Sequence, residues 1–281
     1  MTTEKRISFR DIQKLLEDCK RRTEGFKHKI LVISGKGGVG KTFFSSMLAL
    51  ALATRGKETA ILDADIYGSS VPAMLGLYGL RHYANEKGDI LPVTGPLGVK
   101  VVAINLMLDS PDTPIAWRGS LVSRAIIELL ARVEWDGGDY LVIDMPPGTG
   151  DAALTIIQSL PSISGALVVT APNTLSEIIV AKSINLLTSK SIRLLGIVEN
   201  MAYFKCPICG SKVDLMGKHV GEMLASRYDI PLLGKIPFDP EVNVAVDSQM
   251  PYILAKPDSE VSKAILGIAD KIITLLEHQD I

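Results

Sequence analysis

The sequence predicts an α/β fold with a doubly wound, mostly parallel sheet, and three features of the 281-residue chain lead to that prediction. From residue 29 onward, short apolar runs alternate with longer stretches of helical pattern, as βαβ units require. The apolar runs are nearly continuous instead of alternating with polar residues, which is typical of strands covered on both faces. A glycine-rich loop connects the first apolar run directly to the first helical stretch.

The order of the predicted elements follows the order of these runs. Seven apolar runs are predicted to be strands, at residues 29–34, 59–65, 99–105, 140–144, 165–171, 194–200 and 232–237. Helices are predicted near residues 42–55, 120–133, 151–159, 175–188, 218–227, 240–247 and 258–277. Residues 76–98 hold several Gly and Pro residues and are expected to be irregular.

Domain organisation is predicted from charge and length. Residues 1–28 are charge-rich and precede the first apolar run, so we expect a helical extension there. Within it, Ile12, Leu15, Leu16 and Cys19 fall on one face at helical spacing, and Cys19 is interpreted as a small apolar filler of that face. Residues 29–281 are of a length that commonly forms one α/β domain around one core.

Composition excludes several classes of protein. The chain has 30 Lys and Arg residues against 31 Asp and Glu residues, so no global positive field exists to attract nucleic acid. The N-terminus lacks the apolar core of a signal peptide, and no apolar run reaches the length of a membrane span. We therefore expect a cytoplasmic protein without a nucleic-acid or membrane partner.

The glycine-rich loop fits the phosphate-binding pattern G-x-x-x-x-G-K-[ST]. Its members are Gly35, Lys36, Gly37, Gly38, Val39, Gly40, Lys41 and Thr42. Backbone N–H groups of such a loop surround phosphate oxygens, and the following helix presents its positive N-terminus. Lys41 is expected to neutralise the β and γ phosphates and Thr42 to ligate Mg²⁺. The loop therefore predicts ATP binding with magnesium.

Lys36, directly after the first glycine, adds a second lysine to the loop. A lysine at this place resembles the deviant P-loop NTPases, the group that includes nitrogenase iron protein, MinD and ParA. The resemblance implies that Lys36 reaches across a dimer to the nucleotide of the partner subunit, so hydrolysis would require two subunits face to face. The alternative is a solvated loop lysine.

Polar residues at the ends of three predicted strands are further candidates for the nucleotide site. Asp144 ends an apolar strand at the edge where ligands bind in such sheets, and is expected to hold a magnesium-bound water. Asp63 and Asp65 project from the same side of an extended segment. The resemblance to the deviant group favours Asp65 for orienting the attacking water, whereas Asp63 is either catalytic or a loop-capping carboxylate. Asn200 is expected to read the adenine edge, as implied by an Asn at the matching place in that group.

The chain has three cysteines, and two of them form a pair in the sequence CPICG. Cys206 and Cys209, in an insertion near residues 201–216, can direct two sulfurs at one metal centre. Zinc and [4Fe–4S] sites normally need four protein ligands, so one chain supplies half a site. His219 is a conceivable extra ligand, although a plain surface role is favoured. A second copy of the chain would complete the site with two more thiolates, which predicts a homodimer.

Ligand type alone leaves the metal open, because thiolates suit both zinc and iron–sulfur clusters. A structural zinc clip therefore stands as one alternative. A thioredoxin-like redox pair is less favoured, because that motif sits near a βαβ unit at a helix start.

Taken together, the motifs resemble the Mrp family of ATP-binding iron–sulfur cluster carrier proteins. The resemblance covers residues 30–277 and rests on VISGKGGVGKT, LDADIYGSSVPAMLG, WRGS, YLVIDMPPGTGD, GIVENMAYFKCPICG and LLGKIPFDPEV. It implies a homodimeric ATPase that binds a labile [4Fe–4S] cluster between its subunits and passes it to apo-proteins. The sequence departs from the family at Gly68-Ser69-Ser70, where GPS is usual, and at GKHVGE from Gly217, where a glycine-rich run is usual.

A second hypothesis is a spatial-organisation ATPase of the MinD or ParA kind with a structural zinc clip. Such a protein acts through a membrane or DNA, so this hypothesis predicts a basic amphipathic terminus or a basic face. The last predicted helix instead carries mixed charges beside an apolar stripe, which favours a core-packing helix; the stripe comprises Val261, Ile265, Ile268, Ile272 and Leu276. A third hypothesis, a small-molecule ligase or kinase, would need substrate-binding side chains that the sequence does not identify.

Overall fold

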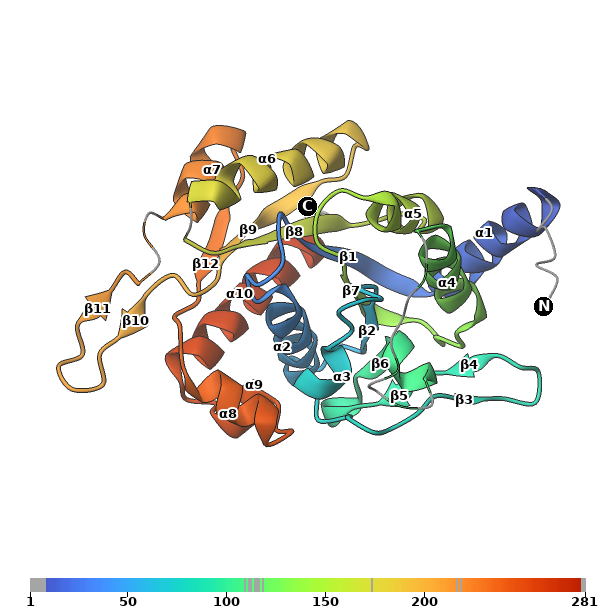
Figure 1. Ribbon diagram of the computed structural model, residues 1–281, viewed down its shortest axis with the longest axis horizontal. Coiled ribbons are helices and arrows are strands. Elements are labelled where there is room, and N and C mark those ends of the chain that lie inside the picture. The colour runs from blue at the N-terminus through green and yellow to red at the C-terminus, as the bar shows by residue number, and fades with distance from the viewer. Residues whose placement is uncertain are drawn as a thin grey trace.

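A computed structural model describes residues 9–108, 110, 113, 117, 119–172, 174–215, 217 and 219–278, without the side chains of residues 9 and 174–176. Its centre is an eight-stranded sheet in the order β12-β9-β8-β1-β7-β2-β6-β5 (Figure 1). All neighbouring strands are parallel except β5, which runs antiparallel to β6. The strands are β1 (Phe26–Ser34), β2 (Thr59–Asp63), β5 (Val93–Thr94), β6 (Lys100–Ala103), β7 (Gly138–Asp144), β8 (Gly165–Thr170), β9 (Leu194–Glu199) and β12 (Leu232–Lys235).

The seven predicted strands are confirmed as the parallel part of this sheet. Most of them end one or two residues before the predicted boundary, whereas β1 begins three residues earlier, at Phe26. Phe26 is buried, pairs with Gly138 of β7 and packs its ring edge-on against Trp135. These contacts with distant residues extend the strand into a segment that the sequence pattern assigns to the extension.

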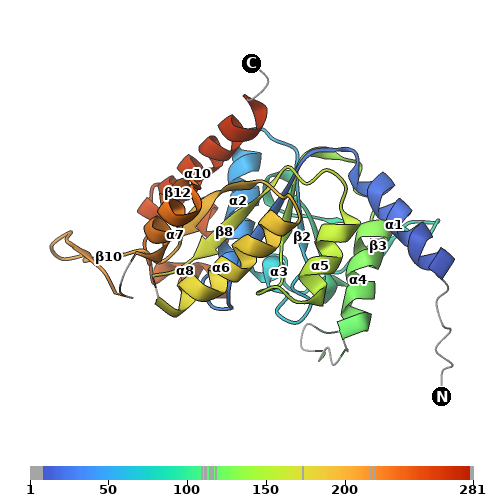
Figure 2. The same cartoon turned by 90° about the horizontal axis from the view of Figure 1, so that it is seen from above.

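Helices cover both faces of the sheet (Figures 1 and 2). One layer contains α1 (Phe9–Thr23), α4 (Gly119–Arg132), α5 (Asp151–Ser159), α6 (Thr174–Ser189) and α7 (Val220–Tyr228). The other layer contains α2 (Lys41–Thr54), α3 (Val71–Met74), α8 (Glu241–Asp247), α9 (Tyr252–Ala255) and α10 (Glu260–Glu277). The short helices α3 and α9 are additions to the predicted set.

The two layers explain why the strands are apolar without alternation. Side chains of consecutive strand residues point to opposite faces. In β1, Ile30 and Val32 pack beneath α2 and α10, whereas Leu31 and Ile33 pack toward α4, α5 and α6. Both sets are buried, so each strand position needs an apolar residue.

The N-terminal helix α1 packs on α4, on the face of the sheet that also carries α5, α6 and α7. Cys19 is fully buried there, with its thiol 3.3 Å from the backbone oxygen of Ile127. Burial raises the pKa of this thiol to about 12, so it stays protonated and unreactive. The interpretation of Cys19 as an apolar filler is confirmed, while residues 1–8 of the extension lie outside the described part.

The segment expected to be irregular contains a small hairpin, β3 (Tyr83–Ala84) and β4 (Ile90–Leu91). The side-chain oxygen of Asn85 accepts hydrogen bonds from the backbone of Lys87 and of Asp89, both at 2.9 Å, and so closes the turn. Strands of two residues are too short to show a period of two, which is why the sequence pattern misses them.

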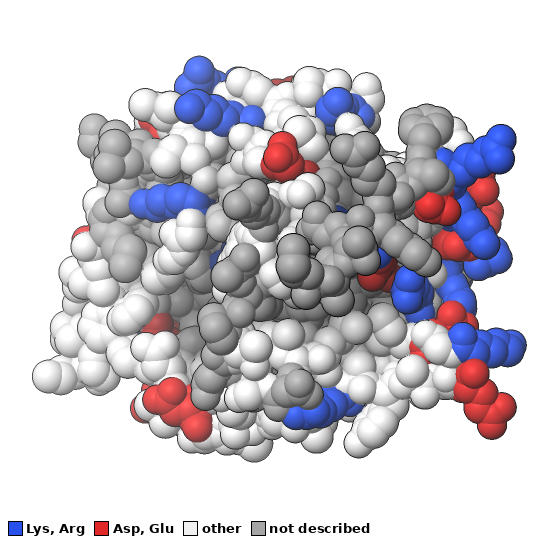
Figure 3. All heavy atoms as spheres, turned by 45° about the vertical axis from the view of Figure 1, so that its right-hand side comes forward, with Lys and Arg blue, Asp and Glu red and all other residues white. Residues whose placement is uncertain are grey.

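The expectations about membranes and nucleic acid concern long apolar helices and basic surface. No helix among the described residues is both long and apolar enough to span a bilayer. The face in Figure 3 shows basic and acidic side chains interspersed, without a broad basic area among its described residues. The apolar stripe of α10 packs toward α2 and β12, as predicted for a core-packing helix, with Leu276 partly buried and its other four residues fully buried.

The burial of α10 predicts a large effect of truncating its stripe. Ile268 is 1% exposed and covers Gly234 of β12, so Ile268→Ala is expected to lower the free energy of unfolding by about 2–5 kcal/mol. Lys263→Ala, at an exposed position of the same helix, is the control and should change it by no more than about 0.5 kcal/mol. Urea denaturation measures both, and equal effects would contradict the packing of α10.

Candidate functional site

The loop between β1 and α2 has the backbone that the phosphate-binding pattern requires. Gly38 and Gly40 have φ angles of 81° and 78°, a left-handed conformation that favours glycine. A Cβ at position 35 would lie 2.6 Å from the backbone nitrogen of Val180 in α6, so only glycine fits there. The hydroxyl of Ser34 donates to the backbone oxygen of Lys36 at 3.0 Å. Residues 35–42 thus form the strand–loop–helix unit predicted from the sequence.

Asp144, at the end of β7, is the centre of a buried hydrogen-bond network. Its Oδ1 lies 2.7 Å from Lys41 Nζ, and its Oδ2 accepts a hydrogen bond from the Thr42 hydroxyl at 2.7 Å. Asp144 is fully buried and Lys41 is 6% exposed, so this is an ion pair removed from water. The structure therefore brings together the three residues predicted for phosphate and magnesium.

Ser45 belongs to the same network, although it is not among the predicted site residues. Its hydroxyl donates to Asp144 at 2.7 Å and also contacts the backbone oxygen of Lys41 at 2.9 Å. Ser45 follows Lys41 by four residues and so lies on the same face of α2. Two consecutive serines, Ser45 and Ser46, interrupt the otherwise apolar, buried part of this helix, and that interruption is the signal that could have identified Ser45.

Asp63, at the end of β2, caps a loop and the first turn of α3. It is fully buried, and its Oδ2 accepts hydrogen bonds from the Ser69 hydroxyl and from the backbone of Ser70 and of Val71, at 2.9–3.0 Å. It pairs in register with Asp144 of the neighbouring strand. Burial and the charge of Asp144 raise the pKa of Asp63 to about 7. The geometry thus favours the loop-capping alternative for Asp63.

Asp65 lies in a more open environment two residues further along the loop. It is half-buried, and its carboxylate accepts a hydrogen bond from the backbone of Gly68 at 3.4 Å. Burial raises its pKa, which makes the carboxylate a better acceptor for the proton or hydrogen bond of a water. Asp65 therefore has the accessibility that Asp63 lacks, and its role as the water-orienting residue stays a prediction.

Asn200 contacts the phosphate loop directly. Its side-chain amide donates to the backbone oxygen of Val39 at 2.9 Å, and it is 4% exposed. A Cβ on Gly40 would lie 2.1 Å from the same amide nitrogen, so the fit between the loop and Asn200 is close. The contact places Asn200 beside the loop, as predicted, while adenine recognition stays a prediction. Lys36 is partly exposed in the loop, and its reach across a dimer also stays a prediction.

The thiol pair lies on a hairpin that projects from the body of the molecule (Figures 1 and 2). Its strands are β10 (Phe204–Lys205) and β11 (Lys212–Val213). The backbone nitrogen of Cys206 donates to Ser211 at 2.9 Å, and Gly210, with φ of 71°, donates back to Cys206 at 2.8 Å. The turn between the strands therefore carries Cys206, which is partly buried, and Cys209, which is exposed.

The thiol of Cys209 is exposed and lies 3.0 Å from the Ser211 hydroxyl. Hydrogen bonds from that hydroxyl and from the Ser211 backbone lower the pKa of Cys209, which favours the thiolate that metals bind. In the described residues no group of three or more His, Cys, Asp or Glu side chains could hold a metal ion. Among the described residues, the thiol pair is therefore without further candidate metal ligands.

His219 does not join the thiols, and it is more than a plain surface residue. Its Nδ1 lies 3.0 Å from Oε2 of Glu199, a fully buried carboxylate at the end of β9. The expectation of a plain surface role is corrected in this respect, because the buried partner lies twenty positions away in sequence and is brought to His219 only by the packing of α7 on β9.

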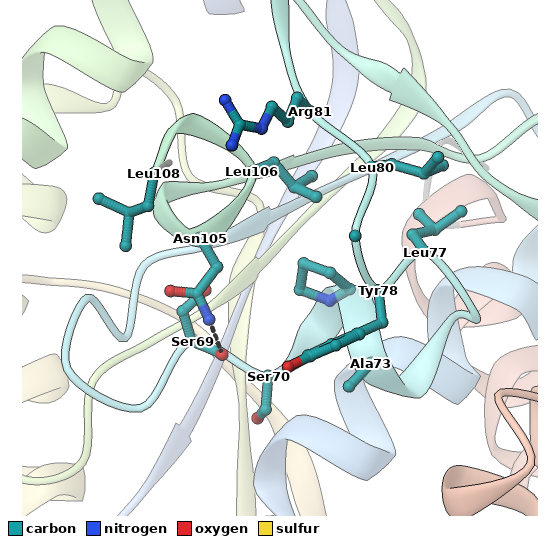
Figure 4. A pocket seen from close by; sticks show the side chains of 12 residues that line it. Ser69, Ser70, Ala73, Leu77, Tyr78, Leu80, Arg81, Asn105, Leu106 and Leu108 are labelled. Carbon is teal, nitrogen blue, oxygen red and sulfur yellow. Dashed lines mark hydrogen bonds between the residues drawn. The ribbon is translucent and has the colours of Figure 1, made fainter. Parts of the chain in front are cut away.

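A small cavity adjoins the loop that holds Asp63 and Asp65 (Figure 4). Asn105 donates to the backbone oxygen of Ser69 at 2.6 Å and so supports the loop from this side. The cavity has a volume of about 160 Å³ and is lined mainly by Ser69, Tyr78, Leu80, Arg81, Asn105 and Leu106. It coincides with the sequence departure at Gly68-Ser69-Ser70, whereas Arg118 of the WRGS motif lies outside the described residues.

The raised pKa of Asp63 predicts a pH-dependent loss of stability. The folded protein retains a proton on Asp63 up to about pH 7, whereas an unfolded Asp loses its proton near pH 4. The stabilising contribution is complete below about pH 4 and is lost as the pH rises through 7. Asp63→Asn keeps an oxygen acceptor without the charge, so the variant should become more stable relative to wild type as the pH rises from about 4 to about 7.

Urea denaturation at several pH values measures this effect. We expect the stability difference to change by up to about 1.4 kcal/mol per pH unit in favour of Asp63→Asn. Asp258→Asn, at an exposed position, is the control and should show a constant difference. A gap between Asp63→Asn and wild type that does not vary with pH would contradict the assignment of a buried, repelled carboxyl.

Comparison with known proteins gives the family. The family model described as "ParA: NUBPL iron-transfer P-loop NTPase" matches residues 25–273. The iron–sulfur cluster carrier protein of Saccharolobus solfataricus is 46% identical over 256 residues, which is 91% of this chain and 86% of the relative. The protein of the same name from Aquifex aeolicus is 42% identical over 260 residues, covering 92% of this chain and 71% of the relative.

Solved structures agree in fold. A nucleotide-binding protein in complex with ADP from Archaeoglobus fulgidus has a TM-score of 0.74 and 38% identity, covering 84% of this chain and 92% of that chain. The septum site-determining protein MinD complexed with Mg-ADP from Pyrococcus horikoshii has a TM-score of 0.64 and 21% identity. The match covers 88% of this chain and 96% of that chain. The chain therefore belongs to the ParA-type iron-transfer P-loop NTPases, the family of the iron–sulfur cluster carrier proteins resembled by its motifs.

Proposed function

We propose that this protein is an ATP-binding, slowly hydrolysing carrier that assembles a [4Fe–4S] cluster between two copies of the chain and transfers it to apo-proteins. One observation carries the proposal: a complete phosphate loop and a thiol pair without further ligands among the described residues occur in the same chain. Membership of the family and the carrier names of the relatives support it.

The nucleotide site would use the residues gathered around Asp144. Backbone N–H groups of residues 35–42 would hold the phosphates, and Lys41 would neutralise their charge. Thr42 Oγ1 and Asp144 Oδ2 lie 2.7 Å apart, and Mg²⁺ prefers oxygen ligands, so Thr42 would bind the ion and Asp144 would hold one of its waters. When bound, magnesium would neutralise phosphate oxygens and orient the nucleotide.

Residues around the loop would perform the remaining steps of hydrolysis. Asp65 would orient the attacking water through its accessible carboxylate, and Asn200 would read the adenine edge. Lys36 would reach the nucleotide of the partner subunit and stabilise the charge that develops during phosphoryl transfer. This division requires two subunits for each completed site, so hydrolysis is slow until the dimer closes.

The cluster is the cargo of the carrier. Cys206 and Cys209 would supply two thiolates, and the same residues of a second copy would supply the other two. The exposure of the hairpin end and the lowered pKa of Cys209 suit a site that must be loaded and emptied. ATP and ADP can control release only by favouring different arrangements of the two subunits.

Cysteine variants test the thiol assignment. After anaerobic reconstitution with iron and sulfide, wild type is expected to hold one cluster per two chains, whereas Cys206→Ala and Cys209→Ala should lose it. Cys19→Ala is the matched control and should retain the cluster, because Cys19 is buried in the core of α1 and α4. Iron analysis and absorption spectroscopy measure the content, and undiminished iron in Cys206→Ala would reject the site.

Mixed dimers test whether Lys36 acts across the interface. Lys36→Ala and Asp65→Asn should each lower ATP hydrolysis at least about tenfold while ADP binding is kept. In a mixed dimer, the Asp65→Asn subunit would supply Lys36 to the intact Asp65 of its partner. Mixing equal amounts should restore roughly a quarter of wild-type activity, since half of the dimers are mixed and each holds one complete site.

The opposite result of the mixing experiment is equally clear. If Lys36 acts within its own subunit, neither site of a mixed dimer is complete and mixing restores nothing. Lys190→Ala, which removes an exposed lysine elsewhere, is the control for the loss of positive charge and should hydrolyse ATP at the wild-type rate.

A further inference from the structure

Glu199 is a buried carboxylate that the proposed function does not use. It ends β9 with no exposed surface, and burial of a carboxylate is unfavourable unless donors surround it. Its Oε1 accepts a hydrogen bond from the backbone of Gly221 at 2.8 Å, its Oε2 lies 3.0 Å from His219 Nδ1, and Lys235 Nζ stands 3.9 Å away. His219 is therefore one of the partners that keep this charge inside the protein.

The contact between Glu199 and the start of α7 is tight. A Cβ on Gly221 would lie 3.0 Å from the Cβ of Glu199, so the first turn of the helix touches the strand end without space between them. His219 directly precedes α7, and the first turn of α7 contacts β9 through Gly221 and Glu199. The backbone of His219 is therefore held close to the end of β9. Its imidazole therefore has a defined place.

The second ring nitrogen of His219 faces the thiol hairpin. Nε2 lies 3.6 Å from Oδ1 of Asp214, an ion-pair distance when the ring is charged. Asp214 directly follows β11, the strand by which the chain returns from Cys209. His219 thus stands between a buried carboxylate of the sheet and a carboxylate at the base of the hairpin.

The outgoing strand of the hairpin is attached to other elements. Lys205 pairs with Glu260 at the start of α10, and the rings of Phe204 and Phe238 lie 6.5 Å apart. The return strand, β11, is attached in a corresponding way. Among the described residues, its ion-pair contact runs from Asp214 to His219, and His219 in turn contacts Glu199 of β9.

The residue after Glu199 contacts the phosphate loop. Asn200 donates to Val39 at 2.9 Å, and consecutive side chains of an extended segment point to opposite sides. The same strand end therefore contacts the nucleotide loop through Asn200 and the thiol hairpin through Glu199 and His219. A shift of this strand end would therefore displace both the phosphate loop and the hairpin.

We propose that His219 is a positioning residue that ties the return strand of the thiol hairpin to the end of β9, so that the position of Cys209 follows the nucleotide loop. The inference deepens the carrier function and rests on it. His219 acts here through Asp214 and Glu199 and is not a ligand of the cluster.

Hydrogen exchange of the hairpin in cluster-free protein tests this tie without needing the cargo. The exchange of a peptide spanning residues 203–215 is measured by mass spectrometry with ATP and with ADP. Wild type should show different protection in the two states. His219→Asn keeps an N–H at the position of Nδ1 for Glu199 but cannot reach Asp214, so it should fold, lose the nucleotide difference, and speed hairpin exchange by about fivefold.

Asp214→Ala removes the carboxylate that contacts His219. Combining it with His219→Asn in a double variant completes a double-mutant cycle. If the two residues act through one contact, the double variant should show the same fivefold effect as each single variant. His278→Ala, at the exposed end of α10, is the histidine control and should behave as wild type. A nucleotide difference that survives in His219→Asn, or additive effects in the double variant, would overturn the proposal.

Cluster content after reconstitution separates this proposal from the carrier function. Content equal to wild type in His219→Asn is expected, since the ligands are intact, and a loss of the cluster would show a ligand role instead. If hairpin exchange in wild type differs between ATP and ADP but no cluster binds, the carrier function is rejected and the positioning role of His219 is retained. If wild type binds the cluster but its hairpin exchanges equally with ATP and with ADP, the positioning role of His219 is rejected and the carrier function is not.

Discussion

The buried pair between Asp144 and Lys41 is the interaction on which the candidate site depends. A carboxylate without exposed surface is tolerated only with donors on its oxygens, and here Lys41, Thr42 and Ser45 supply three at 2.7 Å. Removing one partner of a buried ion pair typically lowers stability by about 3–5 kcal/mol. The pair therefore joins the start of α2, the phosphate loop and β7 into one unit. Asp63, beside it, is held by neutral donors and has a raised pKa.

The parallel sheet explains why the other functional residues lie near this pair. Carboxyl ends of parallel strands meet at one edge, and this edge receives the phosphate loop after β1, Asp63 at the end of β2, Asp144 at the end of β7 and Asn200 after β9. The thiol hairpin also follows β9, so the chain reaches the cysteines only a few residues after it contacts the phosphate loop. Proximity in sequence thus relates the two halves of the proposed mechanism.

Features with a local signal could be predicted from the sequence, and features made by distant pairs could not. The strands, the phosphate loop and the thiol turn each depend on consecutive residues, and the structure contains them where expected. The role of Ser45 depends on Asp144, ninety-nine positions away, and the role of Glu199 depends on His219 across the packing of α7 on β9. For Asp63, two alternatives remained open until the structure placed the backbone of Ser70 and Val71 on its carboxylate.

The proposed function depends on one claim, that two chains complete a single thiolate site. Native mass spectrometry of anaerobically reconstituted protein tests this most directly, because it weighs the intact assembly and its cargo together. We predict a dimer that carries one [4Fe–4S] cluster, with no cluster on the monomer. A monomer that carries a full cluster, or a dimer whose mass fits only zinc ions, would contradict a site shared between two copies.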